Sequence, residues 1–201
     1  MPASNSADST RDRIVDAAKT EFSRYGIAGA RMDRIAKQAR TSKERVYAHF
    51  RSKEALYTFV AGRELALITE ATRMDPTDLP GYAGRLFDYF TEHPERFRMI
   101  GWGRLELNDA TAADDEPTRA AGARKVEQLR RAQQAGHLDP AWDPVHVLAL
   151  VNQIATTWIA QTEMADIARQ AGGATDATRR AAVVRAVQQI FPPAGTALDG
   201  F

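Results

Sequence analysis

Helical periodicity runs through almost the whole chain, and this regularity most limits what it can fold into. Apolar residues recur three and four positions apart from Thr10 to Phe191, in segments separated by glycine, proline and acidic turns. This spacing predicts amphipathic helices. No stretch alternates apolar and polar residues as a half-buried strand does. We therefore expect an all-α fold of about nine helices.

The helical segments begin and end at residues that favour such boundaries. Their expected ranges are 10–25, 32–39, 41–50, 53–72, 82–92, 95–107, 118–135, 145–171 and 176–191. Ser9 or Thr10 can cap the first segment, and Ser52 can cap the fourth. Gly26 follows the first segment at the position where glycine favours a helix end. Arg40 stands at the equivalent position after the second segment, where a tight turn would hold it in a strained left-handed conformation.

Charge is distributed unevenly along the chain, although its formal net value is only +1. Residues 1–53 hold 12 Lys and Arg against 6 Asp and Glu, whereas residues 54–201 hold 15 against 20. The first quarter is thus strongly basic, and the remainder is acidic. A basic head on an acidic body predicts that the head binds a polyanion.

Residues 41–50 form the segment best suited to such a partner. Val46 and Phe50, four residues apart, would share one buried face. That arrangement leaves cationic and hydrogen-bonding side chains on the other faces: Lys43, Arg45, Tyr47 and His49. With segment 32–39 before it, this helix predicts a helix-turn-helix, whose second helix enters the DNA major groove. An ordinary helical hairpin with a solvated basic face is the other interpretation of the same spacing.

A series of residues at fixed spacings extends through residues 10–57. Its members are Thr10-Arg11, Ile14, Ala17-Ala18, Phe22, Gly26, Ile35-Ala36, Ser42-Lys43, Tyr47, His49-Phe50, Ser52-Lys53-Glu54 and Leu56. The series resembles the N-terminal domain of TetR-family transcriptional regulators, whereas the body resembles them only in its pattern of helices. What the resemblance implies is a homodimer that binds a palindromic operator in double-stranded DNA, usually as a repressor released by a small-molecule effector.

The resemblance also implies which residues contact DNA. Ser42 and Lys43 would bind phosphates at the start of the recognition helix, where the helix dipole assists. Tyr47, His49 and Lys53 would bind the backbone, or a thymine methyl in the case of Tyr47. The full set of expected DNA contacts is Arg31, Thr41, Ser42, Lys43, Arg45, Tyr47, His49 and Lys53.

Several positions depart from the pattern of the family. Arg31 replaces the hydroxyl residue common before the second helix, which weakens that cap and adds a cation. Arg40 replaces the turn glycine. Glu44 and Arg45 replace a usual pair of small residues, so Arg45 could read guanine while Glu44 accepts from cytosine. For Glu44 we favour a capping role, in a box with Thr41.

Aromatic residues gather on segments 82–92 and 95–107, and polar residues interrupt the apolar face of segment 145–171. Trp102 lies between two glycines that each cost a helix about 1 kcal/mol, which predicts the close approach of a neighbouring helix or of a ligand. The expected effector-binding residues are Phe87, Phe90, Phe97, Trp102, Glu106, Asn152 and Thr156. Packing in a helical core is the other interpretation of the aromatic residues.

The last two segments carry apolar stripes that one subunit would bury only in part. Such stripes predict a two-fold, four-helix dimer interface. Its expected residues are Val151, Trp158, Val183 and Val187. Burial of the stripes within one subunit stays open as the alternative.

These patterns predict a disordered tail at residues 1–9, a three-helix DNA-binding domain at 10–52 and a larger ligand-binding and dimerisation domain at 53–201. No apolar run approaches the roughly 20 residues that span a bilayer. Without a signal-peptide core, a cytoplasmic location without membrane contact is expected. The chain has no cysteine and no catalytic or metal-binding motif, so we expect no cofactor, metal or catalytic residue. An all-helical enzyme and a ligand-independent DNA-binding regulator are the alternative functions.

Overall fold

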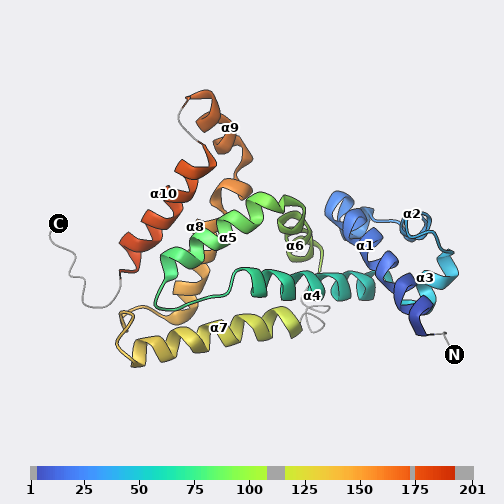
Figure 1. Ribbon diagram of the computed structural model, residues 1–201, viewed down its shortest axis with the longest axis horizontal. Helices are drawn as coiled ribbons and strands as arrows, with labels where there is room; N and C mark the ends of the chain where they lie inside the picture. Colours follow the sequence, from blue (N-terminus) through green and yellow to red (C-terminus); the bar gives the residue numbers. More distant parts are fainter. Residues whose placement is uncertain (1–3, 108–115, 173–174, 193–201) are drawn as a thin grey trace. The chain divides into compact units, whose positions relative to one another are not determined.

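The computed structural model describes residues 4–107, 116–172 and 175–192, and the regular elements in this part of the chain are ten helices (Figure 1). They are α1 (Ser4–Gly29), α2 (Met32–Gln38), α3 (Lys43–His49), α4 (Lys53–Ala71), α5 (Leu79–Glu92), α6 (Pro94–Glu106), α7 (Glu116–Gln134), α8 (Pro144–Ala160), α9 (Thr162–Gln170) and α10 (Asp176–Ile190). The prediction of an all-α fold is confirmed.

The largest departures from the expected ranges are at two of the expected helices. The long helix expected at 145–171 divides at Gln161, whose backbone leaves helical geometry with φ −113° and ψ 74°. Just before this break, the hydroxyls of Thr156 and Thr157 both donate to carbonyls of the preceding turn, a pattern that bends helices. The first helix begins at Ser4, earlier than the expected cap. Its geometry breaks at Gly26, with φ 70°, where the helix was expected to end.

The chain forms two compact units, which are described separately. The first unit contains Met1–Ala66 and Pro94–Thr118, and the second contains Leu67–His93 and Arg119–Phe201. Helix α4 therefore contributes residues to both units. The expected division at residue 53 does not coincide with these units, and it stays a prediction about function.

In the first unit, helices α1, α2, α3 and α6 and most of α4 surround one apolar core. The fully buried side chains at its centre are Ile14, Phe22, Ile35, Val46, Leu56, Val60 and Met99. Beside this core, the Glu64 carboxylate lies 3.3 Å from Lys19 Nζ and 2.8 Å from Arg96 Nε. The three side chains come from α4, α1 and α6, so they join the long helices of the unit around one buried charge.

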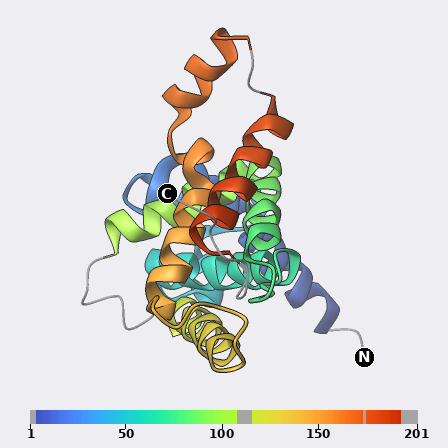
Figure 2. The ribbon, with the colours of Figure 1, turned by 90° about the vertical axis from the view of Figure 1, so that its left-hand side faces the viewer.

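In the second unit, α5 packs against α8 and α10, and these helices lie side by side (Figures 1 and 2). Their buried side chains include Tyr82, Leu86, Phe87, Phe90, Val147, Val151, Ala155, Val183 and Val187. Gly84 of α5 lets α10 approach closely, because a Cβ atom there would lie 2.8 Å from the guanidinium of Arg180. No helix in the described part of the chain is long and apolar enough to cross a membrane.

Candidate nucleic-acid interface

Helix α3 is capped by a hydroxyl residue and is anchored by Val46 and Phe50 as the sequence predicts. The Ser42 hydroxyl accepts a hydrogen bond from the backbone N–H of Arg45 at 3.2 Å, so Ser42, and not Thr41, is the capping residue. Val46 is fully buried and Phe50 is 5% exposed. The exposed residues of the helix are Lys43, Glu44, Arg45, Tyr47 and Ala48, and His49 is half-buried. One face of α3 is therefore fixed in the core while the other presents cations and hydrogen-bonding groups.

Two of these side chains already have partners. Lys43 Nζ lies 3.0 Å from the Asp33 carboxylate of α2, and this contact raises the pKa of Lys43. Hydrogen bonds from its own backbone N–H and from the Ser42 hydroxyl lower the pKa of Glu44. The box expected between Glu44 and Thr41 is not formed, because Ser42 takes the capping position. Arg45 makes no ion pair with any residue that the structure describes.

The turn between α2 and α3 is a tight left-handed one. Arg40 has a positive φ of 52°, as its place in the sequence predicts. Thr41 N–H donates to the Ala36 carbonyl at 3.0 Å, and Arg40 N–H donates to the Lys37 carbonyl at 3.2 Å. This pair of bonds closes a helix in the Schellman motif, in which glycine usually takes the left-handed position. The cationic side chain of Arg40 is exposed beside α3.

The start of α2 is capped by a residue that sequence reasoning did not assign to the site. Arg31 provides no side-chain cap, in agreement with the expected weak cap. Instead, the carboxylate of Glu21, which is 4% exposed, accepts from Arg31 N–H at 2.9 Å and from Arg34 Nε at 2.7 Å. The only sequence signal was that Glu21 interrupts the apolar face of the first helix.

The end of α1 is held by residues expected to bind DNA or the effector. Lys53 Nζ donates to the Ala28 carbonyl at 3.2 Å, and the Glu106 carboxylate accepts from Ala28 N–H. The ring of Trp102 covers Gly26, where a Cβ atom would lie 3.1 Å from it. Side chains of α4 and α6 therefore both form hydrogen bonds with the backbone just before the helix-turn-helix.

The glycines beside Trp102 have different surroundings. A Cβ atom at Gly103 would clash with the hydroxyl of Tyr57, whereas at Gly101 it would meet no atom of another described element within 4 Å. The close approach expected from the sequence, in this case of a side chain of α4, is therefore found at Gly103 and not at Gly101.

The residues expected to bind the effector fall into both units. Phe97, Trp102 and Glu106 belong to the first unit, and Phe87, Phe90, Asn152 and Thr156 to the second. Within the second unit, the Tyr82 hydroxyl lies 3.2 Å from Asn152 Oδ1, while the Thr156 hydroxyl donates within its own helix. Phe90 is buried in the core. The structure does not assign these residues to one cavity.

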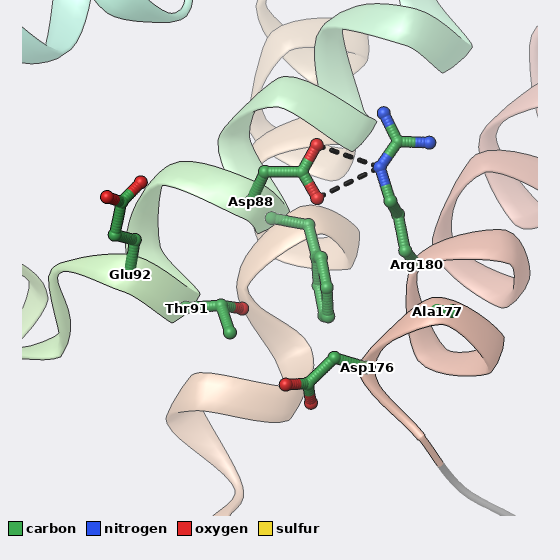
Figure 3. A pocket seen from close by; sticks show the side chains of 7 residues that line it. Asp88, Thr91, Glu92, Asp176, Ala177 and Arg180 are labelled. Carbon is green, nitrogen blue, oxygen red and sulfur yellow. Dashed lines mark hydrogen bonds and ion pairs between the residues drawn. The ribbon is translucent and has the colours of Figure 1, made fainter.

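A pocket of about 330 Å³ lies between α5 and α10, with Phe87 in its wall. Figure 3 shows Asp88 and Arg180 joined across it, and Arg180 Nε lies 2.8 Å from the Asp88 carboxylate. Thr91, Glu92, Asp176 and Ala177 complete the lining. Of the residues expected to bind the effector, Phe87 alone lines this pocket.

Three of the four residues expected at the dimer interface are buried inside the chain itself. Val151, Val183 and Val187 are at most 3% exposed, whereas Trp158 is half-buried with the Arg179 guanidinium 5.4 Å from its ring centre. The apolar side chains left for a second copy lie on adjacent stripes of the same helices: Leu150, Ile154 and Trp158 on α8, and Ala182, Ala186 and Ile190 on α10. A dimer built on these two helices would have to use them.

Two family models match the chain. Residues 14–58 match the model described as bacterial regulatory proteins of the tetR family, and residues 78–189 match the tetracyclin repressor-like C-terminal domain. Together they cover both the basic head and the helical body.

Curated relatives extend over nearly the full length of the chain. The HTH-type transcriptional repressor SCO4008 of Streptomyces coelicolor is 32% identical, over 94% of this chain and 98% of the relative. The HTH-type transcriptional regulator RutR of Escherichia coli is 28% identical, over 88% and 84%. These relatives are named as regulators, not as enzymes.

Solved structures of similar fold include another transcriptional regulator. The crystal structure of SCO4942 from Streptomyces coelicolor, described as a transcriptional regulator, is similar with a TM-score of 0.82 and 61% identity, over 91% of this chain and 98% of that one. FadR of Bacillus subtilis in complex with stearoyl-CoA has a TM-score of 0.69 at 14% identity, over 88% and 96%, which shows a shared fold alone.

Proposed function

The chain belongs to the TetR family of bacterial transcriptional regulators, and from this membership we propose that it is a repressor that binds a palindromic operator as a homodimer and leaves it when a small molecule binds. Its place of action is the cytoplasm, where the DNA is. The observation that carries the proposal is the exposed cationic face of α3, anchored by Val46 and capped by Ser42.

The residues of this face divide into two roles. Lys43 at the first turn of α3 meets a phosphate, exchanging its Asp33 partner for it, and Tyr47 and His49 hold the backbone farther along. Arg45 has no competing ion pair in the described part of the chain, so its planar guanidinium is available to pair with O6 and N7 of a guanine. Glu44 stays with the helix cap and reads no base.

The test of this proposal compares Arg45→Ala with Lys43→Ala. An operator is first selected from a pool of random duplexes, and dissociation constants are then measured for it and for a scrambled duplex at several salt concentrations. Arg45→Ala should lose about 1–3 kcal/mol of discrimination at one base pair. Lys43→Ala should weaken binding to both duplexes alike and reduce the salt slope by about one.

Arg24→Ala, on the exposed surface of α1, is a suitable control for loss of one positive charge. If the intact protein selects no sequence, or if Lys43→Ala and Arg45→Ala behave alike, the assignment of α3 as the reading helix is wrong.

A two-fold dimer matches the symmetry of a palindromic operator. Two copies of α3 must be about 34–36 Å apart to enter successive major grooves, and we propose that the exposed stripes of α8 and α10 hold them there. An effector that binds more tightly to a different spacing then lowers operator affinity, and by linkage the operator lowers effector affinity by the same factor. A ligand-independent regulator, the second candidate, would show no such coupling with any ligand bound to its body.

A further inference from the structure

Helix α7 carries a cation on its inward face. Ala121, Leu129 and Ala132 are at most 7% exposed, and they follow the spacing of four and three residues that places side chains on one side of a helix. Lys125 stands in the same row, between Ala121 and Leu129. Its side chain therefore points toward the interior of the second unit, where it is half-buried.

The ammonium of Lys125 is joined to two other helices of this unit. Its Nζ donates to the Tyr82 hydroxyl of α5 at 2.8 Å, and that hydroxyl donates in turn to Asn152 Oδ1 of α8 at 3.2 Å. Tyr82 is fully buried. Burial raises the pKa of Tyr82, which keeps its hydroxyl neutral, and burial lowers the pKa of Lys125. Two of the three ammonium donors remain available.

Lys125 differs from the other shielded cations of the second unit in having no carboxylate partner. Arg85 lies 3.4 Å from Asp78, Arg179 lies 3.4 Å from Asp176, and Arg180 lies 2.8 Å from Asp88. Among the residues that the structure describes, none pairs with Lys125 in this way. A charge withdrawn from water without a counter-charge costs stability, which is a feature more typical of binding sites than of cores.

Helix α7 also packs less closely than the other long helices of the second unit. In the described part of the second unit, α5 packs closely against α8 and α10, whereas α7 is not among the closely packed pairs. One turn away along α7, Lys125 has the buried apolar side chains Ala121 and Leu129 on either side. A molecule with a charged head and an apolar body would suit such a place.

We propose that Lys125, with Tyr82 and Asn152, binds the anionic head of an organic effector, a carboxylate or a phosphate, whose apolar body lies along α7. This inference rests on the proposed function, because it names the chemical class of the molecule that releases the regulator. The head takes the free ammonium donors, and the Tyr82 hydroxyl orients the ammonium toward it. Sequence reasoning found Asn152 from its place on an apolar face, but it did not single out Lys125.

The test is calorimetric titration of the intact protein with four probes of one chain length: octanoate, octyl phosphate, octanol and octylammonium. Octanoate or octyl phosphate should bind at least tenfold more tightly than the alcohol and the amine, and the stronger of the two identifies the head group. Lys125→Met should lose at least tenfold of this affinity, whereas Lys125→Arg should retain part of it. Arg124→Met, on the exposed side of the same helix, should bind as the unmodified protein does.

The proposal is overturned if neither anion binds, if octanol binds as well as the anions, or if Lys125→Met binds them with unchanged affinity. Operator binding by the unmodified protein is measured separately by gel shift, with and without the anion. Anion binding that depends on Lys125, in a protein that binds no DNA, would support the site and refute the proposed function. Operator binding without any affinity for the anions would support the proposed function and refute the site.

Discussion

At the scale of single residues, Arg40 adopts a backbone conformation that is unfavourable for a residue with a side chain. Its φ of 52° places it in the left-handed region, which costs a residue with a Cβ atom about 1–2 kcal/mol. Arg40→Gly should therefore raise the free energy of unfolding, by up to about 1 kcal/mol after the greater freedom of glycine in the unfolded chain is subtracted. Urea denaturation measures this gain.

The same substitution removes an exposed cation beside α3, the helix that we propose binds DNA. Operator affinity should fall even as stability rises, and the salt slope should fall with it. Arg40→Ala separates the two effects, because it removes the charge and keeps the strain. Equal stability of the glycine and alanine variants would contradict the strain.

Lys125 gives a second case in which a residue weakens the fold that contains it. Burial lowers its pKa from the ordinary value of 10.5, so at neutral pH the folded state carries a shielded charge that the unfolded state exposes to water. Lys125→Met should raise the thermal midpoint at pH 7, by roughly 2–4 °C for each 1 kcal/mol in a chain of this size.

The advantage of methionine should shrink as the pH rises. The folded protein releases the Lys125 proton at a lower pH than the unfolded chain does. The stability of the unmodified protein therefore rises relative to that of the variant until the pH reaches about the pKa of lysine in the unfolded chain. Thermal midpoints measured from pH 7 to 10, with Arg124→Met for comparison, test this. A difference that stays constant with pH would show that the charge of Lys125 is not the cause.

At the scale of elements, the cap of α2 depends on a carboxylate in a different helix. Glu21→Gln keeps the size of the side chain but removes the charge that pairs with Arg34 and accepts from Arg31 N–H. Because this carboxylate is buried, the variant should lose about 1–3 kcal/mol of stability and weaken operator binding through a loosened α2. Denaturation followed by circular dichroism measures the loss. Glu54→Gln, at an exposed position, should leave the free energy of unfolding nearly unchanged.

Local patterns predicted the elements better than they predicted their partners. The end of α2 and the start of α4 followed from the turn at Arg40 and from Ser52, since caps and turns act within a few residues. The break at Gln161 was missed, because the threonine hydroxyls that precede it are equally compatible with an unbroken helix. Glu21 and Lys125 were missed as partners because their contacts join residues 10 and 43 positions apart.

At the scale of the whole molecule, burial decides which substitutions can report on dimerisation. Val187 is fully buried within its own chain, so Val187→Asp should unfold the second unit rather than separate subunits. Leu150 is 40% exposed, and Leu150→Asp should give a folded monomer with little operator affinity. Sedimentation velocity at micromolar concentration measures the state of assembly, and His146→Asp, at an exposed position on α8, is the charge control. A dimeric Leu150→Asp protein would exclude this stripe from the interface.

The backbone of Ala28 is hydrogen-bonded to both α4 and α6. Its N–H donates to Glu106 of α6, and its carbonyl accepts from Lys53 of α4, while the methyl group of Ala28 is exposed. Exchange of that methyl for another side chain leaves both bonds in place, so a mutational scan would record position 28 as tolerant. Both hydrogen bonds use backbone atoms, and every amino acid except proline has the N–H that one of them needs. Ala28→Pro, or an ester in place of the amide before residue 28, would remove the N–H and its bond to Glu106 while leaving the carbonyl that accepts from Lys53.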